Sequence, residues 1–167
     1  MAAPETGDEE NQPRILIDGD ACPVKADAMR VAERHRLPVV IVSNGGLRPS
    51  RDPMVTHVVV AKRADAADDW IVEQVRVGEI VVTADIPLAA RVVAKGAHAL
   101  GPNGRPFTPD SIGMALAMRD LKQHLRETGE IRGINPEFTR EDRSRFLGEM
   151  DRLARRAKAA GGRSAKR

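Results

Sequence analysis

The hydrophobic positions of this chain fall into short apolar runs separated by longer amphipathic segments. Five runs have the length and the Val and Ile content of buried strands, and they lie at 15–18, 39–42, 58–60, 80–82 and 97–100. Segments with apolar residues at helical spacing lie between them, at 24–36, 65–77 and 87–95. This alternation predicts an α/β fold, a three-layer sandwich built on a mainly parallel five-stranded sheet.

Two further amphipathic segments follow the last predicted strand, at 110–125 and from 139 to about 160. Thr139 and Asp142 stand at capping-box spacing before the second segment. Its apolar stripe packs either on the domain or on a partner, so a homodimer stays open: Phe146, Leu147, Met150, Leu153, Ala154 and Ala157. We therefore expect a disordered leader at 1–12, a single α/β domain at 13–155 and a basic disordered tail at 156–167.

Composition adds limits on location and class. The chain has 167 residues, of which 41% are hydrophobic and 2% aromatic, so aliphatic side chains must build the core of one domain. The chain carries no apolar run of membrane-spanning length, and its start lacks the features of a signal peptide. Because Cys22 is the only cysteine, no internal disulfide can form and we expect a cytoplasmic location.

The net charge of +3 is unevenly distributed. The last 17 residues hold seven Lys or Arg against one Asp, so the high isoelectric point is largely a property of the tail. A basic tail can contact phosphates without sequence preference, although a solvated tail is the simpler interpretation.

Aspartates gather at the ends of the predicted strands. Asp18 ends the first strand, Asp20 follows it, and Asp85 follows the fourth, while Asp65 and Asp68 open the helix after the third. Because parallel strands present their carboxyl ends at one edge, we expect these five side chains to converge. Clustered carboxylates repel one another, and Mg²⁺ or Mn²⁺ relieves that repulsion with all-oxygen ligands. The pattern predicts a metal or acid/base site in which all five are candidate ligands and catalytic residues.

A structural role for some of these acids stays open. Asp65 and Asp85 each precede a predicted helix, where an aspartate can cap the first turn and interact favourably with the helix dipole. Asp18 and Asp20 are harder to explain in this way, because a strand that ends in two carboxylates is costly without a ligand.

Polar and basic residues follow the same strands. Asn44, Arg48, Lys62 and Arg63 lie after the second and third strands and are candidate substrate-binding residues. An acidic centre with a basic rim suits a phosphodiester, although ordinary solvated loop charges would look the same. Trp70 lies inside a predicted helix and is expected in the core, so the chain offers no stacking platform of the OB-fold or RRM type.

Three segments together resemble the YaiI/YqxD family, also called UPF0178 or DUF188: Ile-Asp-Gly-Asp-Ala-Cys-Pro at 17–23, Asp-Ala-Ala-Asp-Asp-Trp-Ile at 65–71 and Val-Val-Thr-Ala-Asp-Ile-Pro-Leu-Ala-Ala at 81–90. The resemblance runs from about residue 14 to 153. This bacterial, largely uncharacterised family looks like a relative of PIN-like and NYN nuclease domains, which implies a metal-dependent ribonuclease acting on RNA. By that resemblance the five aspartates are Mg²⁺ or Mn²⁺ ligands, with Asp68 favoured over Asp69, and Thr83 orients a water or ligand.

Two other functions fit part of the pattern, and whether the protein is an enzyme stays open. In a haloacid-dehalogenase-like phosphatase, Asp18 would be the nucleophile, Asp20 the acid/base and Lys62 the motif lysine, but Asp65 and Asp68 would have no role. In a non-catalytic module, the aspartates would hold a regulatory metal or support RNA binding. The role of Cys22 is open as well; a small residue before a helix start is the simpler interpretation.

Overall fold

The structure is a computed structural model that describes residues 12–20, 22–129 and 138–164. Its strands form one five-stranded sheet in the order β3-β2-β1-β4-β5, and every pairing is parallel. The strands are β1 Ile15–Asp18, β2 Val39–Ser43, β3 Val55–Val59, β4 Ile80–Val82 and β5 His98–Leu100. The strand order reverses direction at β1, so β1 and β4 flank the topological switch point, where open α/β sheets bind their ligands.

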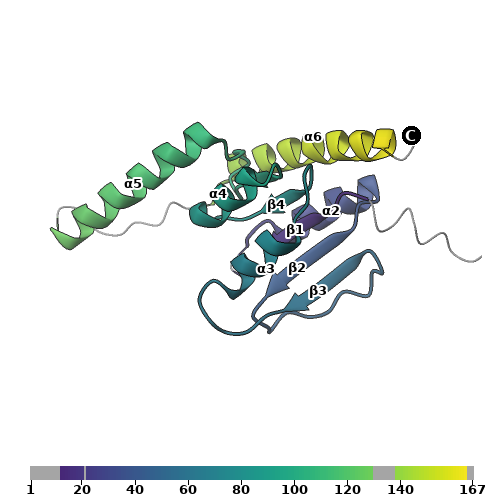
Figure 1. Ribbon diagram of the computed structural model, residues 1–167, viewed down its shortest axis with the longest axis horizontal. Coiled ribbons are helices and arrows are strands. Elements are labelled where there is room, and N and C mark those ends of the chain that lie inside the picture. Colours follow the sequence, from purple (N-terminus) through teal and green to yellow (C-terminus); the bar gives the residue numbers. More distant parts are fainter. Residues whose placement is uncertain (1–11, 21, 130–137, 165–167) are drawn as a thin grey trace, which may run out of the picture.

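Helices cover both faces of this sheet (Figure 1). Ile15 and Ile17 of β1 pack with residues of α2 (Lys25–His35) and α6 (Arg140–Ser164). Leu16, which points to the opposite face, packs with residues of α3 (Ala66–Gln74) and α4 (Ile86–Ala94). The three-layer sandwich expected from the sequence is confirmed, and its core is almost entirely aliphatic.

The last helix packs on its own domain. Phe146, Met150 and Ala154 of α6 are buried against the α2 face of the sheet. The predicted capping box forms: Asp142 N donates to Thr139 Oγ1 at 3.1 Å, and Thr139 N donates to Asp142 Oδ2 at 3.0 Å. α6 runs to Ser164, so residues 156–164, which we expected in a disordered tail, are helical. Ala157, the last residue of the predicted apolar stripe, is buried, so the packed part of α6 reaches beyond 155.

Two more boundaries differ by three residues from those expected. β3 begins at Val55 rather than at 58, because this edge strand mixes half-buried with exposed residues and its first half includes the polar Thr56 and His57. α3 ends at Gln74, three residues before the expected end. The expected leader at 1–12 lies outside the described residues except for Gln12.

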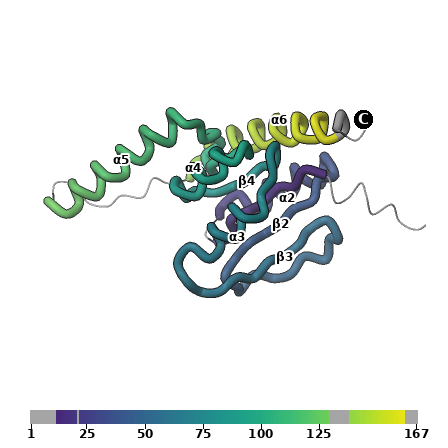
Figure 2. Tube along the Cα trace, in the orientation of Figure 1, coloured from purple at the N-terminus to yellow at the C-terminus, as the bar shows by residue number. Residues whose placement is uncertain are grey.

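α5 (Pro109–Glu127) differs from the other helices. It extends away from the sheet, as the chain trace shows (Figure 2). Ile112 is its one buried residue. Among the described residues, no helix combines the length and the apolar character needed to cross a membrane.

Candidate metal centre

The centre of the site is a hydrogen-bonded link across the switch point. The hydroxyl of Thr83, just after β4, donates to Asp18 Oδ2 at 3.1 Å. Thr83 Oγ1 in turn accepts from the backbone N–H of Asp85 at 3.0 Å. Thr83 is 1% exposed, so this link is protected from solvent. It fixes the end of β1 to the turn that opens α4.

The segments that follow β1 and β4, on the two sides of the switch point, border one cavity of about 290 Å³. Its lining contains three of the five candidate ligands, and it consists of Asp18, Asp20, Cys22, Thr83, Ala84, Asp85 and Pro102. The polar atoms that these side chains offer are mainly carboxylate and hydroxyl oxygens, which suit Mg²⁺ or Mn²⁺.

The charges in this region raise carboxyl pKa values. Burial raises the pKa of Asp18; the hydrogen bond from Thr83 acts against this, and the charges of Asp20 and Asp85 add to the rise. Burial and the charges of Asp85, Asp18 and Asp65 raise the pKa of Asp68 to about 6, although Arg91 acts in the opposite direction. All five predicted aspartates therefore belong to one electrostatically coupled group.

Asp85 and Asp65, the two aspartates that could cap a helix, differ in whether they do so. Asp85 Oδ1 accepts from the N–H of Leu88 at 2.9 Å, so Asp85 does cap α4 while it lines the cavity. Asp65 occupies the N-cap position of α3 but its side chain makes no capping hydrogen bond. Its backbone is left-handed, with φ of 66°, a conformation that costs energy for a residue with a Cβ and that Asp tolerates better than most residues.

Asp69 has partners of its own. Its carboxylate pairs with Arg91 Nη1 at 3.0 Å and with Arg63 Nη1 at 3.8 Å. Asp68, the neighbouring residue, has three acidic neighbours whose effect on its pKa exceeds that of Arg91. The two acids thus have different environments, and the preference for Asp68 as a ligand has a physical basis.

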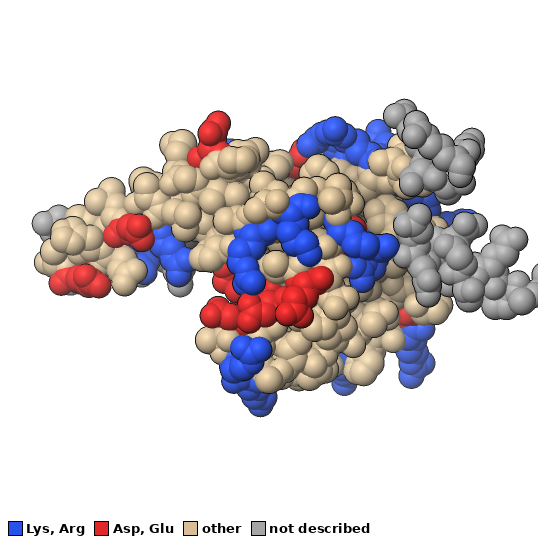
Figure 3. Space-filling view, viewed as in Figure 1, with Lys and Arg blue, Asp and Glu red and all other residues tan. Residues whose placement is uncertain are grey.

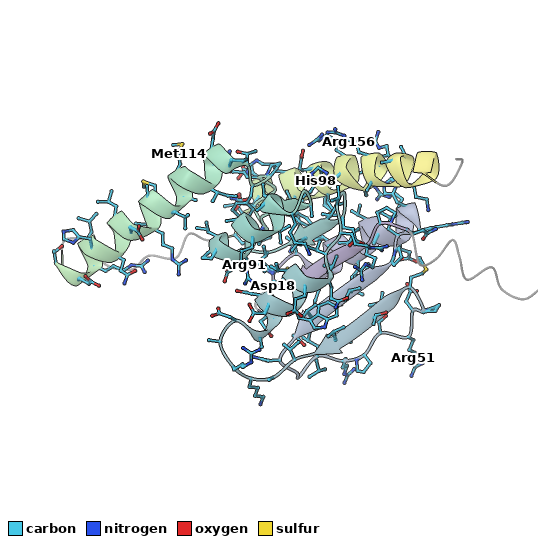
Figure 4. The ribbon with its side chains drawn as sticks, in the orientation of Figure 1. Asp18, Arg51, Arg91, His98, Met114 and Arg156 are labelled. Carbon is cyan, nitrogen blue, oxygen red and sulfur yellow. The ribbon has the colours of Figure 1, made fainter. Side chains whose placement is uncertain are left out.

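Arg91 is a rim residue that sequence reasoning missed, because it lies 22 positions from Asp69 and within a helix. Figure 3 shows the acidic patch on this face with Lys and Arg side chains above and below it. Figure 4 labels Asp18 and Arg91 on neighbouring elements of this region. Arg91 and Arg63 approach Asp69 from α4 and from the loop before α3, so the guanidinium groups border the acids from two elements.

The other predicted substrate-binding residues lie farther out. Asn44 and Arg48 are exposed on the loop after β2, and Lys62 is exposed after β3. None of the three lines the aspartate cavity. Trp70 packs against the core but also lines a second, shallow hollow of about 290 Å³ together with Arg63 and Asp69. The expectation of a purely internal Trp70 is therefore only partly correct.

Cys22 also lines the cavity. Burial raises the pKa of Cys22, and the charge of Asp18 adds to the rise. Since the thiolate is the nucleophilic form, this environment disfavours nucleophilic chemistry at Cys22.

The five candidate aspartates do not surround a common point. Among residues 12–20, 22–129 and 138–164, no group of three or more His, Cys, Asp or Glu side chains is positioned to hold a metal ion. The donor chemistry and the mutual repulsion fit a divalent cation, but the side-chain positions would have to close around it.

Taken together, the chain is a parallel α/β domain with an acidic cavity at the switch point of its sheet. Within this class it belongs to the YaiI/YqxD family: the family model described as "Uncharacterized BCR, YaiI/YqxD family", DUF188, matches residues 16–156. This confirms the resemblance seen in the three sequence segments.

Curated bacterial relatives agree with this assignment. A UPF0178 protein of Mesorhizobium japonicum is 70% identical over 145 residues, covering 87% of this chain and 94% of the relative. A UPF0178 protein of Rhizobium etli is 60% identical over 148 residues, covering 89% and 96%. One from Parvibaculum lavamentivorans is 61% identical over 137 residues, covering 82% and 90%. No solved structure matches the chain.

Proposed function

We propose that this protein is a metal-dependent ribonuclease that uses Mg²⁺ or Mn²⁺ at the aspartate cavity to hydrolyse RNA with a water molecule. The observation that carries the proposal is the uncompensated charge at the switch point. Asp68 has a pKa raised to about 6 by burial and by three neighbouring aspartates, and Asp18 shifts in the same direction. A partly buried cluster of like charges is expensive unless it has a ligand of opposite charge.

Four of the aspartates divide into two that hydrogen bonds hold in place and two that would move toward the cation. Asp18 and Asp85 are fixed by Thr83 and by the Leu88 N–H, so they would form the rigid part of the ligand set. Asp20 is exposed and Asp68 is half-buried, so these two would close on the cation. A bound Mg²⁺ or Mn²⁺ would supply an activated water and stabilise charge on the phosphate.

The arginine pair beside the cavity suits the rest of the substrate. Asp69 holds Arg63 and Arg91 near each other, and guanidinium groups bind phosphates in a bidentate manner. The hollow lined by Arg63 and Trp70 would accept a base of the same strand, because an aromatic ring and a guanidinium group both stack on nucleobases. We therefore propose single-stranded RNA as the substrate class.

The test is cleavage of labelled single-stranded RNA by the purified protein with Mn²⁺. We expect cleavage by the wild type, and a loss of about 100-fold or more in Asp18→Asn, the scale on which metal sites lose activity when their ligation is disturbed. Asn is isosteric with Asp and can still accept from Thr83, so the variant should fold. Asp120→Asn is the matched control, since Asp120 is an exposed aspartate on α5.

The same samples separate the other functions. Hydrolysis of a small phosphomonoester with a trapped aspartyl-phosphate would identify a phosphatase instead. Saturable RNA binding without cleavage would identify a non-catalytic module. Trp70 is the only tryptophan, so its fluorescence reports RNA binding at the hollow in all three cases. Equal cleavage by wild type and Asp18→Asn would contradict the proposal.

A further inference from the structure

One apolar face of α5 has no cover within the described part of the chain. Met114 is 72% exposed, and Met118 and Leu121 are each 49% exposed. With Leu125, which is half-buried, they follow a spacing of four, three and four residues, which places all four side chains on one stripe of the helix. Met114 points away from the sheet in Figure 4. Large side chains exposed in such a row are typical of a protein contact rather than of a solvated surface.

The stripe is complementary to itself in reverse. If two copies of α5 pack antiparallel, Met118 of each copy meets Leu121 of the other in the two central layers. The same register brings Met114 of each copy to Leu125 of the other in the outer layers. Every layer then pairs a Met with a Leu, and no apolar side chain of the stripe is left without a partner. A contact in which the same patch serves both copies is the geometry of a two-fold dimer.

The residues beside the stripe fit the same arrangement. In an antiparallel pair each flank faces the same flank of the other helix. One flank would place Ala117 opposite His124, and the other would place Ala115 opposite Lys122. Small residues thus face long ones, and no two like charges are opposed. The charges on α5 therefore do not resist self-association in this register.

The shape of the molecule leaves room for this partner. α5 has 19 residues and is about 28 Å long, and it extends away from the sheet (Figure 1). Antiparallel packing would place the two α/β domains at opposite ends of the helix pair, where they do not compete for space. Parallel packing would place both domains at the same end.

We propose that a second copy of this chain covers α5, forming an antiparallel homodimer through Met114, Met118, Leu121 and Leu125. The sequence left open whether the last helix packs on its own domain or on a partner; α6 packs on its own domain, and α5 provides the exposed apolar surface. This inference is independent of the ribonuclease proposal, because α5 contributes no residue to the aspartate cavity.

The first test is the mass of the full-length protein in solution, measured by sedimentation velocity at low and high concentration. We expect a reversible dimer in the wild type and a monomer in Met118→Glu/Leu121→Glu. Gln123→Glu is the matched control, because Gln123 lies on the opposite side of α5, and it should dimerise normally. Circular dichroism checks that each variant keeps its helix content. A wild type that stays monomeric at every concentration, or a dimer that the double variant retains, would overturn the proposal.

The second test fixes the orientation. On a Cys22→Ser background, Met114→Cys and Leu125→Cys proteins are mixed and treated with a short bifunctional maleimide. We expect a crosslink between the two different proteins in the mixture, and none in Leu125→Cys alone, because those positions would lie about 16 Å apart along the axis. Efficient crosslinking of Leu125→Cys to itself would show a parallel pair and contradict the proposed register.

Discussion

Carboxylates lie at two opposite edges of the sheet, one formed by the amino ends of the strands and the other by their carboxyl ends. The surroundings shift carboxyl pKa values in opposite directions at these two edges. Glu79, just before β4, is 1% exposed and accepts hydrogen bonds from Arg14 and from Arg76. Burial raises the pKa of Glu79, but these hydrogen bonds outweigh it and the net shift is downward. At the opposite edge, burial and neighbouring acids raise the pKa of Asp18 and of Asp68.

The difference separates a structural carboxylate from one available to a ligand. Glu79 has its positive partners within the chain, so it needs nothing further and contributes to the fold. Asp18 has only neutral hydrogen-bond donors, the hydroxyl of Thr83 and the backbone of Asp20, and its charged neighbours Asp20 and Asp85 are negative. Carboxylates with mainly negative neighbours are typical of a functional site, where the residues that bind a ligand lower the stability of the fold.

The largest expected effect on stability is at the amino-end edge of the strands, where Glu79 is paired. Glu79→Gln should lower the free energy of unfolding by about 3 kcal/mol, the scale for breaking a buried ion pair by removing one partner. Urea titration at neutral pH measures this. Because the pKa of Glu79 is lowered on folding, its stabilisation is present above the pKa of the unfolded chain and is lost as the pH falls through the folded value. A loss below about 1 kcal/mol would remove the contrast.

The support of the acidic cavity should be nearly as sensitive. Gly104 lies two residues after Pro102, which lines the cavity, and has φ of 81°. A Cβ at this position would stand 2.3 Å from the backbone N of Phe146 in α6. We expect Gly104→Ala to cost about 2 kcal/mol or more.

Gly148→Ala is the control for that change, since it adds the same methyl group to α6 with no atom within 4 Å. It should be neutral or raise the free energy of unfolding by about 0.5 to 1 kcal/mol. Thermal unfolding of both variants measures the difference. Equal effects would mean that the loop does not rest on α6 as described.

At the carboxyl-end edge, where the aspartates cluster, the pH dependence of stability should have the opposite sign. Because the pKa of Asp68 is raised to about 6, the folded state binds its proton more tightly, and stability falls as the pH rises from the unfolded value of about 3.9 towards 6. Asp68→Asn should therefore increase stability above pH 6 without divalent cations, by less than about 1 kcal/mol for a half-exposed group. A clear loss of stability would show that Asp68 is a structural residue.

The smallest effect is a shift in a titration. Carboxyl NMR shifts of Asp68 should titrate near pH 6 without metal. Adding Mg²⁺ should move that midpoint to lower pH, because cation and proton compete for the same oxygens. Asp69, which is paired with Arg63 and Arg91, serves as the internal reference. A midpoint for Asp68 that Mg²⁺ leaves unchanged would exclude it from the ligand set.

The sequence predicted the fold well because local pattern and topology agree in this chain. The continuous apolar run at 39–42 and the amphipathic segments between strands predict an α/β order, and parallel pairing then brings Asp18 and Asp85 to one edge. The prediction failed where burial is partial. β3 lies at the sheet edge, and its first three residues, Val55 to His57, do not form an apolar run, so the sequence pattern did not predict them.

The pairs that distinguish the two edges could not be predicted. Arg14 meets Glu79 across 65 positions, and Arg91 meets Asp69 across 22. No periodicity or spacing signals such contacts, because they depend on how neighbouring strands and helices pack. The sequence identifies which acids share an edge, but only the structure shows which of them are neutralised.

Titration calorimetry with Mn²⁺ at pH 7.5 tests the central claim most directly, that the switch-point aspartates bind a divalent cation. We predict saturable binding to the wild type, loss of that binding in Asp18→Asn, and retention in Asp120→Asn. Identical binding by wild type and Asp18→Asn, or no binding by either, would contradict the claim.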